Sequence, residues 1–144
     1  MPGTHKSIGT PLANWHETIL TKLDRYTGFD VDIGETHIIV TCQNPYSFEV
    51  SIYEDGGEFQ VGFAGWHEHF DAEEDALNCF AFGLSQECRL KIVKRGKMEC
   101  SWTLQSRENG AWIDDTTTGL IIIPFWRPTE IEHRHNIIKR KDDG

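Results

Sequence analysis

The sequence has no hydrophobic run long enough to cross a membrane as a helix. Its longest apolar stretch, residues 120–126, spans seven positions and contains a proline, whereas a transmembrane helix needs about 20 apolar residues. The first 14 residues also lack the apolar core of a secretory signal peptide. We therefore expect a cytoplasmic protein with no membrane-spanning segment.

The sequence also lacks the short motifs of several enzyme and metal-site classes. Its four cysteines form no Cys-x-x-Cys pair, which zinc ribbons and thioredoxin-like sites require. There is no Gly-x-Ser-x-Gly elbow, no glycine-rich phosphate loop and no His-Glu-x-x-His motif. Each cysteine falls on an apolar face of the pattern below, where a reduced thiol acts as a small hydrophobic side chain.

Positive charge is absent from almost half of the chain. The 144 residues carry 14 Lys and Arg against 23 Asp and Glu, a net charge of −9. No Lys or Arg lies between Arg25 and Arg89, a stretch of 63 residues with 13 acids. Five cations then fall within residues 89–97, and three more at 139–141. This polarity predicts either internal neutralisation by a basic hairpin or an acidic surface that attracts a basic partner and repels nucleic acid.

Hydrophobic periodicity predicts two helices separated by strands. Residues 12–26 carry apolar side chains at three- and four-residue spacing, which is typical of an amphipathic helix. Asp71 followed by Glu74 is typical of a second helix start, and an apolar stripe continues from there to Leu84.

Elsewhere the apolar residues alternate, as in β-strands. A meander of three strands is predicted at 38–42, 48–52 and 59–63. The predicted pairs are Val40 with Val50 and, across an Asp55-Gly56 turn, Ile52 with Phe59. Later hairpins are predicted to pair Ile92 with Cys100 and to turn at Asn109-Gly110. The last strand, 119–126, is apolar on both faces, so it lies either within a sheet or against a partner.

These elements predict a single α+β domain over residues 1–144, with 1–10 and 132–144 less ordered. The predicted order is a helix, a three-strand meander, a second helix and three to four further strands. We expect one antiparallel sheet of six to seven strands with both helices packed on one face, because the strands share one apolar face that the helices can cover.

One segment gathers side chains of the kinds that bind metals or transfer protons. In an extended chain His67 and His69 point to the same side, and Glu73 or a third histidine, for which the pair His133-x-His135 is available, would complete a site for a divalent metal. Trp66 and Glu68 adjoin the two histidines. Such a site can activate water. The competing interpretation is that these side chains fill the crossing between a strand and the second helix.

The spacing His67-x-His69-x-x-x-Glu73 is similar to the first motif of the cupin family, which places its metal ligands at these intervals. The glycines that open and close that motif would fall at Val61 and Phe80. No second cupin motif is present, and a helix starting near residue 71 would move Glu73 away from the strand.

Three segments resemble those of a group of small, functionally uncharacterised bacterial proteins. They are GFAGWHEHFD at 62–71, FGLS at 82–85 and TGLIIIPFWR at 118–127. The element order, size and acidity also resemble type III secretion chaperones, which are acidic homodimers that bind an extended segment of a secreted protein. Immunity proteins of bacterial toxins are likewise small and acidic, and many of them neutralise basic nucleases.

The sequence therefore predicts a non-enzymatic bacterial binding protein that uses an acidic face to meet a basic protein partner, without a cofactor. The meander is expected to supply the charged surface, and the last strand an apolar contact or homodimer seam. The residues expected there are Glu49, Tyr53, Glu54, Glu58, Ile121, Ile123 and Phe125. The alternative hypothesis is a metal-dependent or histidine-based enzyme with its site at His67 and His69.

Overall fold

The structure, a computed structural model, describes residues 13–120 and 126–141. Two helices and eleven strands follow one another in these residues, and all their strand pairings are antiparallel. The α+β class is therefore confirmed. In chain order the elements are α1 (Asn14–Leu23), β1 (Tyr26–Thr27), β2 (Phe29–Ile33), β3 (His37–Cys42), β4 (Val50–Asp55), β5 (Glu58–Phe63), β6 (Trp66–Phe70), α2 (Glu73–Gly83), β7 (Cys88–Arg95), β8 (Met98–Glu108), β9 (Ala111–Gly119), β10 (Thr129–Arg134) and β11 (Lys139–Arg140).

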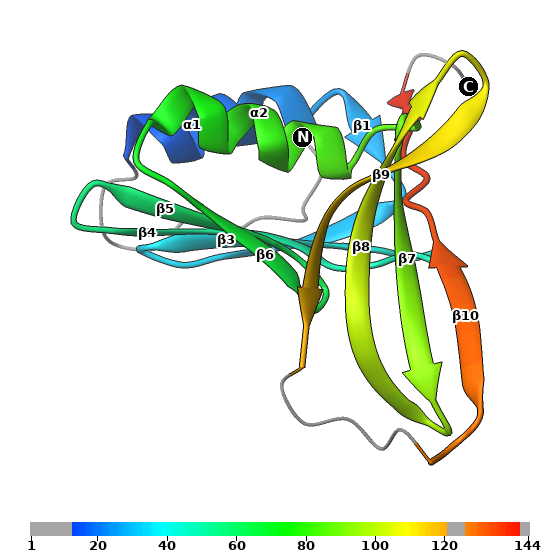
Figure 1. The fold of residues 1–144 in the computed structure, drawn as a ribbon. Coiled ribbons are helices and arrows are strands. Elements are labelled where there is room, and N and C mark those ends of the chain that lie inside the picture. The colour runs from blue at the N-terminus through cyan, green and yellow to red at the C-terminus, as the bar shows by residue number, and fades with distance from the viewer. Residues whose placement is uncertain (1–12, 121–125, 142–144) are drawn as a thin grey trace.

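Strands β2 to β6 form a five-stranded meander in which each strand pairs with the next. Both helices lie on one side of this sheet, and the other side carries no helix of the described chain (Figure 1). α2 contacts β4, β5 and β6. Trp15 of α1 meets Phe59 of β5 edge to face, with 5.8 Å between ring centroids. The sequence analysis predicted three of these strands and missed β2 and β6.

The core lies between the helices and the meander. Side chains alternate between the two sides of a strand, and six on the helix side have no exposed surface: Ile38, Val40, Val50, Ile52, Val61 and Phe63. The helices add Trp15, Ile19, Leu23 and Phe80 to the same cluster. Burying one such side chain contributes about 1.5–3 kcal/mol, so this layer fixes both helices on the sheet.

The remaining strands form a second, four-stranded sheet in the order β10-β7-β8-β9. It extends from the meander at a steep angle (Figure 1). The two ladders of β8 each contain a register shift, one opposite Val93/Lys94 and one at Thr103/Gln105. Such bulges increase the twist of a strand and so accompany this bend. A short pairing of β1 with β11 makes a third sheet.

The prediction of a single sheet of six to seven strands is therefore wrong. The meander ends at β6 because side chains of β9, rather than a backbone ladder, meet the outer edge of that strand. The His67 backbone N–H donates to Thr118 Oγ1 at 3.3 Å, and Trp66 Nε1–H donates to Thr116 Oγ1 at 2.9 Å. The second sheet consequently starts as a separate ladder at β7.

Turn geometry decides which predicted registers hold. Val40 pairs with Val50 as predicted, and Asn109-Gly110 forms a turn with positive φ angles of 51° and 81°. The turn between β4 and β5 is Gly56-Gly57 instead of Asp55-Gly56, so Ile52 faces Val61 rather than Phe59. That register differs from the predicted one by two residues, and the apolar side chains therefore stay on the helix side.

The second sheet's first hairpin also differs from its prediction. Ile92 pairs with Trp102 instead of Cys100, because Arg95 pairs directly with Met98 across a two-residue turn and the ladder shifts between Val93 and Lys94. The predicted last strand, 119–126, falls largely on residues 121–125, which lie outside the described residues; β9 ends at Gly119.

The C-terminal segment adds one strand to the second sheet and one to the third. β10 and β11 lie in it, and both include positions beyond residue 131, where the sequence analysis expected less order. Asn136, which has no exposed surface, fastens the segment between the layers: its Oδ1 accepts from the Phe48 N–H and its Nδ2 donates to the Gly83 carbonyl, both at 3.0 Å. No helix of the described chain is long and apolar enough to span a membrane.

Candidate functional site

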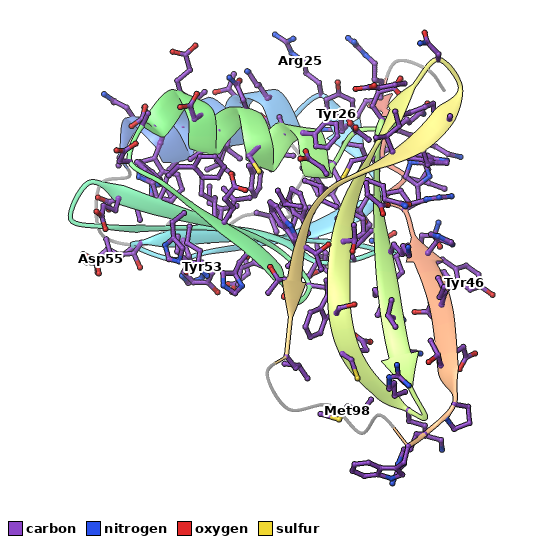
Figure 2. The ribbon with its side chains drawn as sticks, in the orientation of Figure 1. Arg25, Tyr26, Tyr46, Tyr53, Asp55 and Met98 are labelled. Atoms are coloured by element: carbon purple, nitrogen blue, oxygen red, sulfur yellow. The ribbon has the colours of Figure 1, made fainter. Side chains whose placement is uncertain are left out.

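The side of the meander turned away from the helices, which we name the open face, is the strongest candidate surface. Its side chains alternate in sequence with the buried ones, and its residues are Asp30, Asp32, His37, Ile39, Thr41, Ser51, Tyr53, Asp55, Glu58, Gln60, His67 and His69. In Figure 2, Tyr53 and Asp55 lie on the side of the sheet opposite the helices.

A row of polar and aromatic side chains crosses the open face from strand to strand. Backbone register places His37 beside Tyr53, Tyr53 beside Gln60, and Gln60 beside His69. The His37 and Tyr53 rings are tilted against each other with centroids 5.5 Å apart. At one end of the row, His37 Nε2 lies 3.3 Å from Asp32 Oδ2. Tyr53 keeps 41% of its surface exposed, so its ring is available to a partner.

The open face is acidic because of how the chain distributes its charges. Asp30, Asp32, Asp55 and Glu58 are all exposed there, and the whole meander lies in the stretch of 63 residues without Lys or Arg. No cation of the sheet itself therefore offsets these carboxylates.

The residues predicted to bind a partner do not all lie on the same face of the sheet. Tyr53 and Glu58 lie on the open face. Glu54 lies on the opposite side of β4, and its carboxylate accepts a hydrogen bond from the Gly57 N–H at 2.9 Å, which closes the turn. Glu49 is exposed just before β4, and its carbonyl accepts from the Ala64 N–H.

The apolar part of that prediction falls on residues for which no structure is described. Ile121, Ile123 and Phe125 all belong to the range 121–125. Their assignment to a homodimer seam or partner contact stays a prediction.

The residues predicted to bind a metal likewise lie on different sides of the sheet and on different elements. His67 and His69 are exposed on the open face with ring centroids 6.1 Å apart. Glu68 points to the helix side, Glu73 is the first residue of α2, and Trp66 is buried with 1% of its surface exposed. Within the described chain, no group of three or more His, Cys, Asp or Glu is arranged to hold a metal ion. The histidine pair is what remains of the predicted site.

The thiols are poor nucleophiles in this fold. Burial raises the pKa of Cys42 to about 11, against a weaker effect of a hydrogen bond from the Ile137 backbone. Burial, with the nearby negative charges of Glu68 and Asp115, raises the pKa of Cys79 to about 12. Burial also raises the pKa of Cys88. Because the thiolate is the reactive form, these cysteines act as apolar packing groups at neutral pH.

Four charged or titratable residues of the open face were not predicted from the sequence: Asp30, Asp32, His37 and Asp55. The signal was present, since Asp30 and Asp32 alternate with Phe29, Val31 and Ile33 in the period-two pattern of a strand. With β2 unassigned, however, nothing placed those carboxylates next to the meander.

Comparison of the chain with protein-family models, with curated proteins and with solved structures found no match. The resemblances noted for the sequence segments stay predictions. The function proposed below is inferred from the residues of the chain and their arrangement.

Proposed function

We propose that this protein is a non-enzymatic binding module that holds a basic protein partner against the open face. The observation that supports this most directly is a sheet face that no helix of the described residues covers and that is built entirely from a segment without Lys or Arg. Acidic surfaces of this kind steer basic partners into contact and reject acidic ones. A bacterial immunity protein or secretion chaperone would use such a face without catalysing a reaction.

The ion pairs of the described residues favour an external partner over internal neutralisation. The bridges from Lys94 and Arg134 both end on Glu132, and the bridge from Arg107 ends on Glu87. Neither glutamate belongs to the strands of the meander. Lys94, Arg107 and Arg134 thus pair with carboxylates outside the meander, and on the open face the only ion pair shown for a described residue is the contact between Asp32 and His37 of the same sheet.

The centre of the open face supplies an aromatic contact among the charges. Tyr53 is flanked by His37 and Gln60 and lies one residue before Glu54 and two before Asp55. Tyrosine is enriched at binding hot spots because it buries a large area with few rotatable bonds. An arginine of the partner can stack on that ring while its guanidinium pairs with a neighbouring carboxylate. We therefore propose an arginine-containing basic surface as the partner.

Partner capture with matched charge variants tests this proposal. The wild-type bait is compared with D32N/D55N/E58Q, which removes three of the four carboxylates of the open face, and with E17Q/D24N/E108Q, which removes the same charge from exposed positions elsewhere. Proteins retained from a native bacterial lysate are identified by mass spectrometry after washes at about 50 mM and about 300 mM salt, because screening weakens exposed charge pairs.

We expect a basic protein that wild type and control both retain at low salt, that high salt removes, and that the open-face variant fails to retain. Identical retention by the open-face variant, or retention that does not change with salt, would contradict the proposal. Melting temperatures of the three baits establish that all of them are folded.

A further inference from the structure

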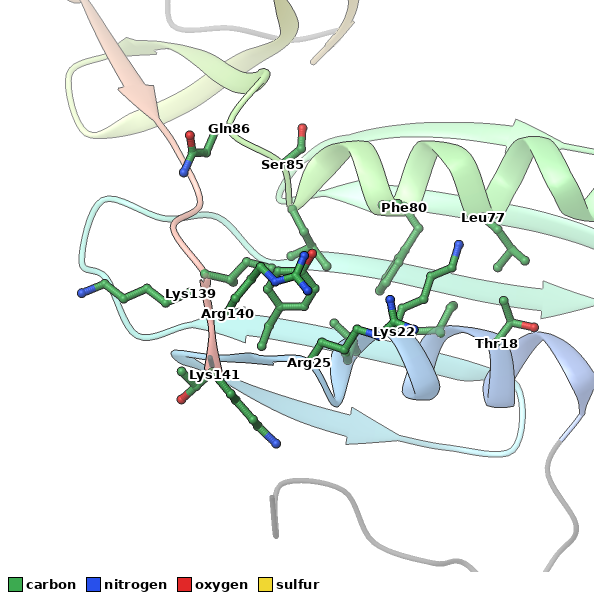
Figure 3. Close-up of a pocket in the computed structure, with 17 residues that line it drawn as sticks. Thr18, Lys22, Arg25, Leu77, Phe80, Ser85, Gln86, Lys139, Arg140 and Lys141 are labelled. Carbon is green, nitrogen blue, oxygen red and sulfur yellow. The ribbon is translucent and has the colours of Figure 1, made fainter. Parts of the chain in front are cut away.

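A groove on the helix side of the molecule is a second candidate binding site, separate from the open face. It has a volume of about 830 Å³ and lies where α1 and α2 end, beside β1 and β11 (Figure 3). Small-molecule sites in proteins commonly have volumes of about 300–1,000 Å³. We name this cavity the helix-end groove.

The floor of the helix-end groove is apolar and already packed. Ile19 and Leu23 of α1 face Phe80 of α2 and Leu84, the residue that follows α2, and each of the four keeps less than a tenth of its surface exposed. Leu77 and Ile138 extend this floor and are partly buried. The floor is thus a margin of the hydrophobic core, so the groove needs no rearrangement before an apolar group enters it.

The rim of the groove is strongly basic. Five cations line it: Lys22, Arg25, Lys139, Arg140 and Lys141. All five are exposed, and among the described residues no acidic side chain lines the cavity. Figure 3 shows Lys22, Arg25 and Arg140 around its mouth, whereas Lys139 extends away. In a chain with a net charge of −9, this is a concentrated positive site.

Helix dipoles account for only part of this positive charge. α1 ends at Leu23 and α2 ends at Gly83, and the free carbonyls of a helix end act as about half a negative charge. The two ends together therefore offset about one of the five cations. Lys22 and Arg25, which lie at the mouth of the groove, are the cations that an anionic ligand would meet.

We propose that the helix-end groove binds a small amphiphilic anion. Its apolar body would lie on the floor between α1 and α2, and its carboxylate or phosphate would meet Lys22 and Arg25. Seventeen residues line the groove, fewer than the roughly 20–30 that each side of a standard protein interface contributes. The dimensions therefore favour a small molecule over a protein. This site is independent of the open face, because the meander separates the two.

Calorimetric titration with four amphiphiles that share a twelve-carbon chain tests the ligand class. The probes are dodecanoate, dodecyl phosphate, dodecanol and dodecyltrimethylammonium, each kept below its micelle concentration at about 20 mM salt. We expect saturable 1:1 binding of at least one anion, with the alcohol and the cation weaker by about tenfold or more. The two anions distinguish a carboxylate ligand from a phosphate ligand. Equal binding of all four probes, or no saturable binding of either anion, would overturn the proposal.

Two variants locate the binding site. K22E/R25E reverses two of the five positive charges of the rim, and A81F fills the cavity from an exposed position of α2 that lines it. The matched controls are K97E/R127E, which reverses two cations before β8 and β10, and A111F at the start of β9; all three positions are exposed and outside the groove. We expect each groove variant to weaken the anion about tenfold or more and each control to change it less than twofold. Unchanged affinity in both groove variants, with melting temperatures like wild type, would place the ligand elsewhere and refute the proposal.

Discussion

Asn136 joins three parts of the chain through one buried amide. It accepts a hydrogen bond from the N–H of Phe48, which precedes β4, and donates one to the carbonyl of Gly83 at the end of α2. Its own backbone belongs to the segment between β10 and β11. A side chain with both a donor and an acceptor is needed at this point, because neither backbone group has access to water.

Replacing Asn136 by alanine should destabilise the protein by about 2–4 kcal/mol. The variant leaves the Phe48 N–H and the Gly83 carbonyl buried without partners, and each unsatisfied group costs about 1–3 kcal/mol. Chemical denaturation measures the free energy of unfolding. Asn78→Ala, at an exposed position of α2, is the matched control and should change stability by less than about 0.5 kcal/mol. Equal effects of the two substitutions would show that the buried amide contributes nothing particular.

Gly83 ends α2 where the helix touches the meander. A Cβ atom at this position would lie 2.3 Å from Cε1 of Phe63, a fully buried ring that stacks on Trp66 with centroids 4.7 Å apart. The ring is held from both sides, so it cannot move aside without disturbing the core.

Gly83→Ala should therefore destabilise the protein, although alanine is the better helix former. The gain in helix propensity is at most about 1 kcal/mol, whereas overpacking a core costs about 1–3 kcal/mol. We expect a net loss of about 1 kcal/mol or more in thermal or chemical denaturation. Adding Phe63→Leu should make the effect of Gly83→Ala smaller, because the smaller side chain removes the overlap. If Gly83→Ala lowered the free energy of unfolding by the same amount with and without Phe63→Leu, this explanation would be contradicted.

At the level of elements, hydrophobic periodicity predicted which strand residues face inward more reliably than which residues pair. Ile52 is buried as the alternation requires, yet its partner is Val61, because a Gly56-Gly57 turn and an Asp55-Gly56 turn differ by two residues and preserve the face. The division into two sheets depends on side-chain contacts at the edge of β6 and on bulges in β8. Neither leaves a periodic signal in the sequence.

The candidate site, too, could be predicted from the sequence pattern only in part. Alternation alone places Tyr53 and Glu58 on one face, and it places His67 and His69 together. The helix-end groove was not predicted, because its rim joins Lys22 and Arg25 to Lys139–Lys141, more than 100 positions later in the chain. Only the pairing of β1 with β11 brings these cations together.

Two titratable side chains of β10, Glu132 and His133, have lowered pKa values and lie beside cations of β7 and β10. A hydrogen bond from Arg134, at 2.6 Å, and the charges of Arg134 and Lys94 lower the pKa of Glu132 despite some burial. Burial and the positive charges of Arg89 and Lys91 lower the pKa of His133. Both groups therefore bind protons less readily in the folded protein than in the unfolded chain.

Stability should consequently fall as the pH falls, in two steps. For a group whose folded pKa is lowered, the stabilisation is complete above the unfolded pKa and is lost as the pH drops through the folded value. The His133 step begins near its ordinary value of 6.5, and the Glu132 step near 4.5. Melting temperature against pH measures both. His133→Gln should remove the first step and Glu132→Gln the second; a profile unchanged in either variant would assign that step to other groups.

Charge is separated across the whole molecule. The open face carries carboxylates on one side of the meander, and the helix-end groove carries five cations on the other side. In the second sheet, Arg89 and Arg107 both lie over the ring of Trp112, 4.5 Å and 4.8 Å from its centroid. Although the net charge is −9, the molecule therefore presents surfaces of opposite sign, and these surfaces suit different ligands.

The two proposed sites should act independently. The meander and its core separate them, and exposed charges farther apart than about 8–10 Å are largely screened at physiological salt. Two sites are coupled only if one ligand changes the affinity of the other, and none of the residues that line the groove belongs to the open face. The open-face variant D32N/D55N/E58Q should therefore bind the favoured dodecyl anion within twofold of wild type, measured by calorimetry at about 150 mM salt. An affinity change of tenfold would show that the faces communicate, and the groove would then be a regulatory site for the partner rather than a separate one.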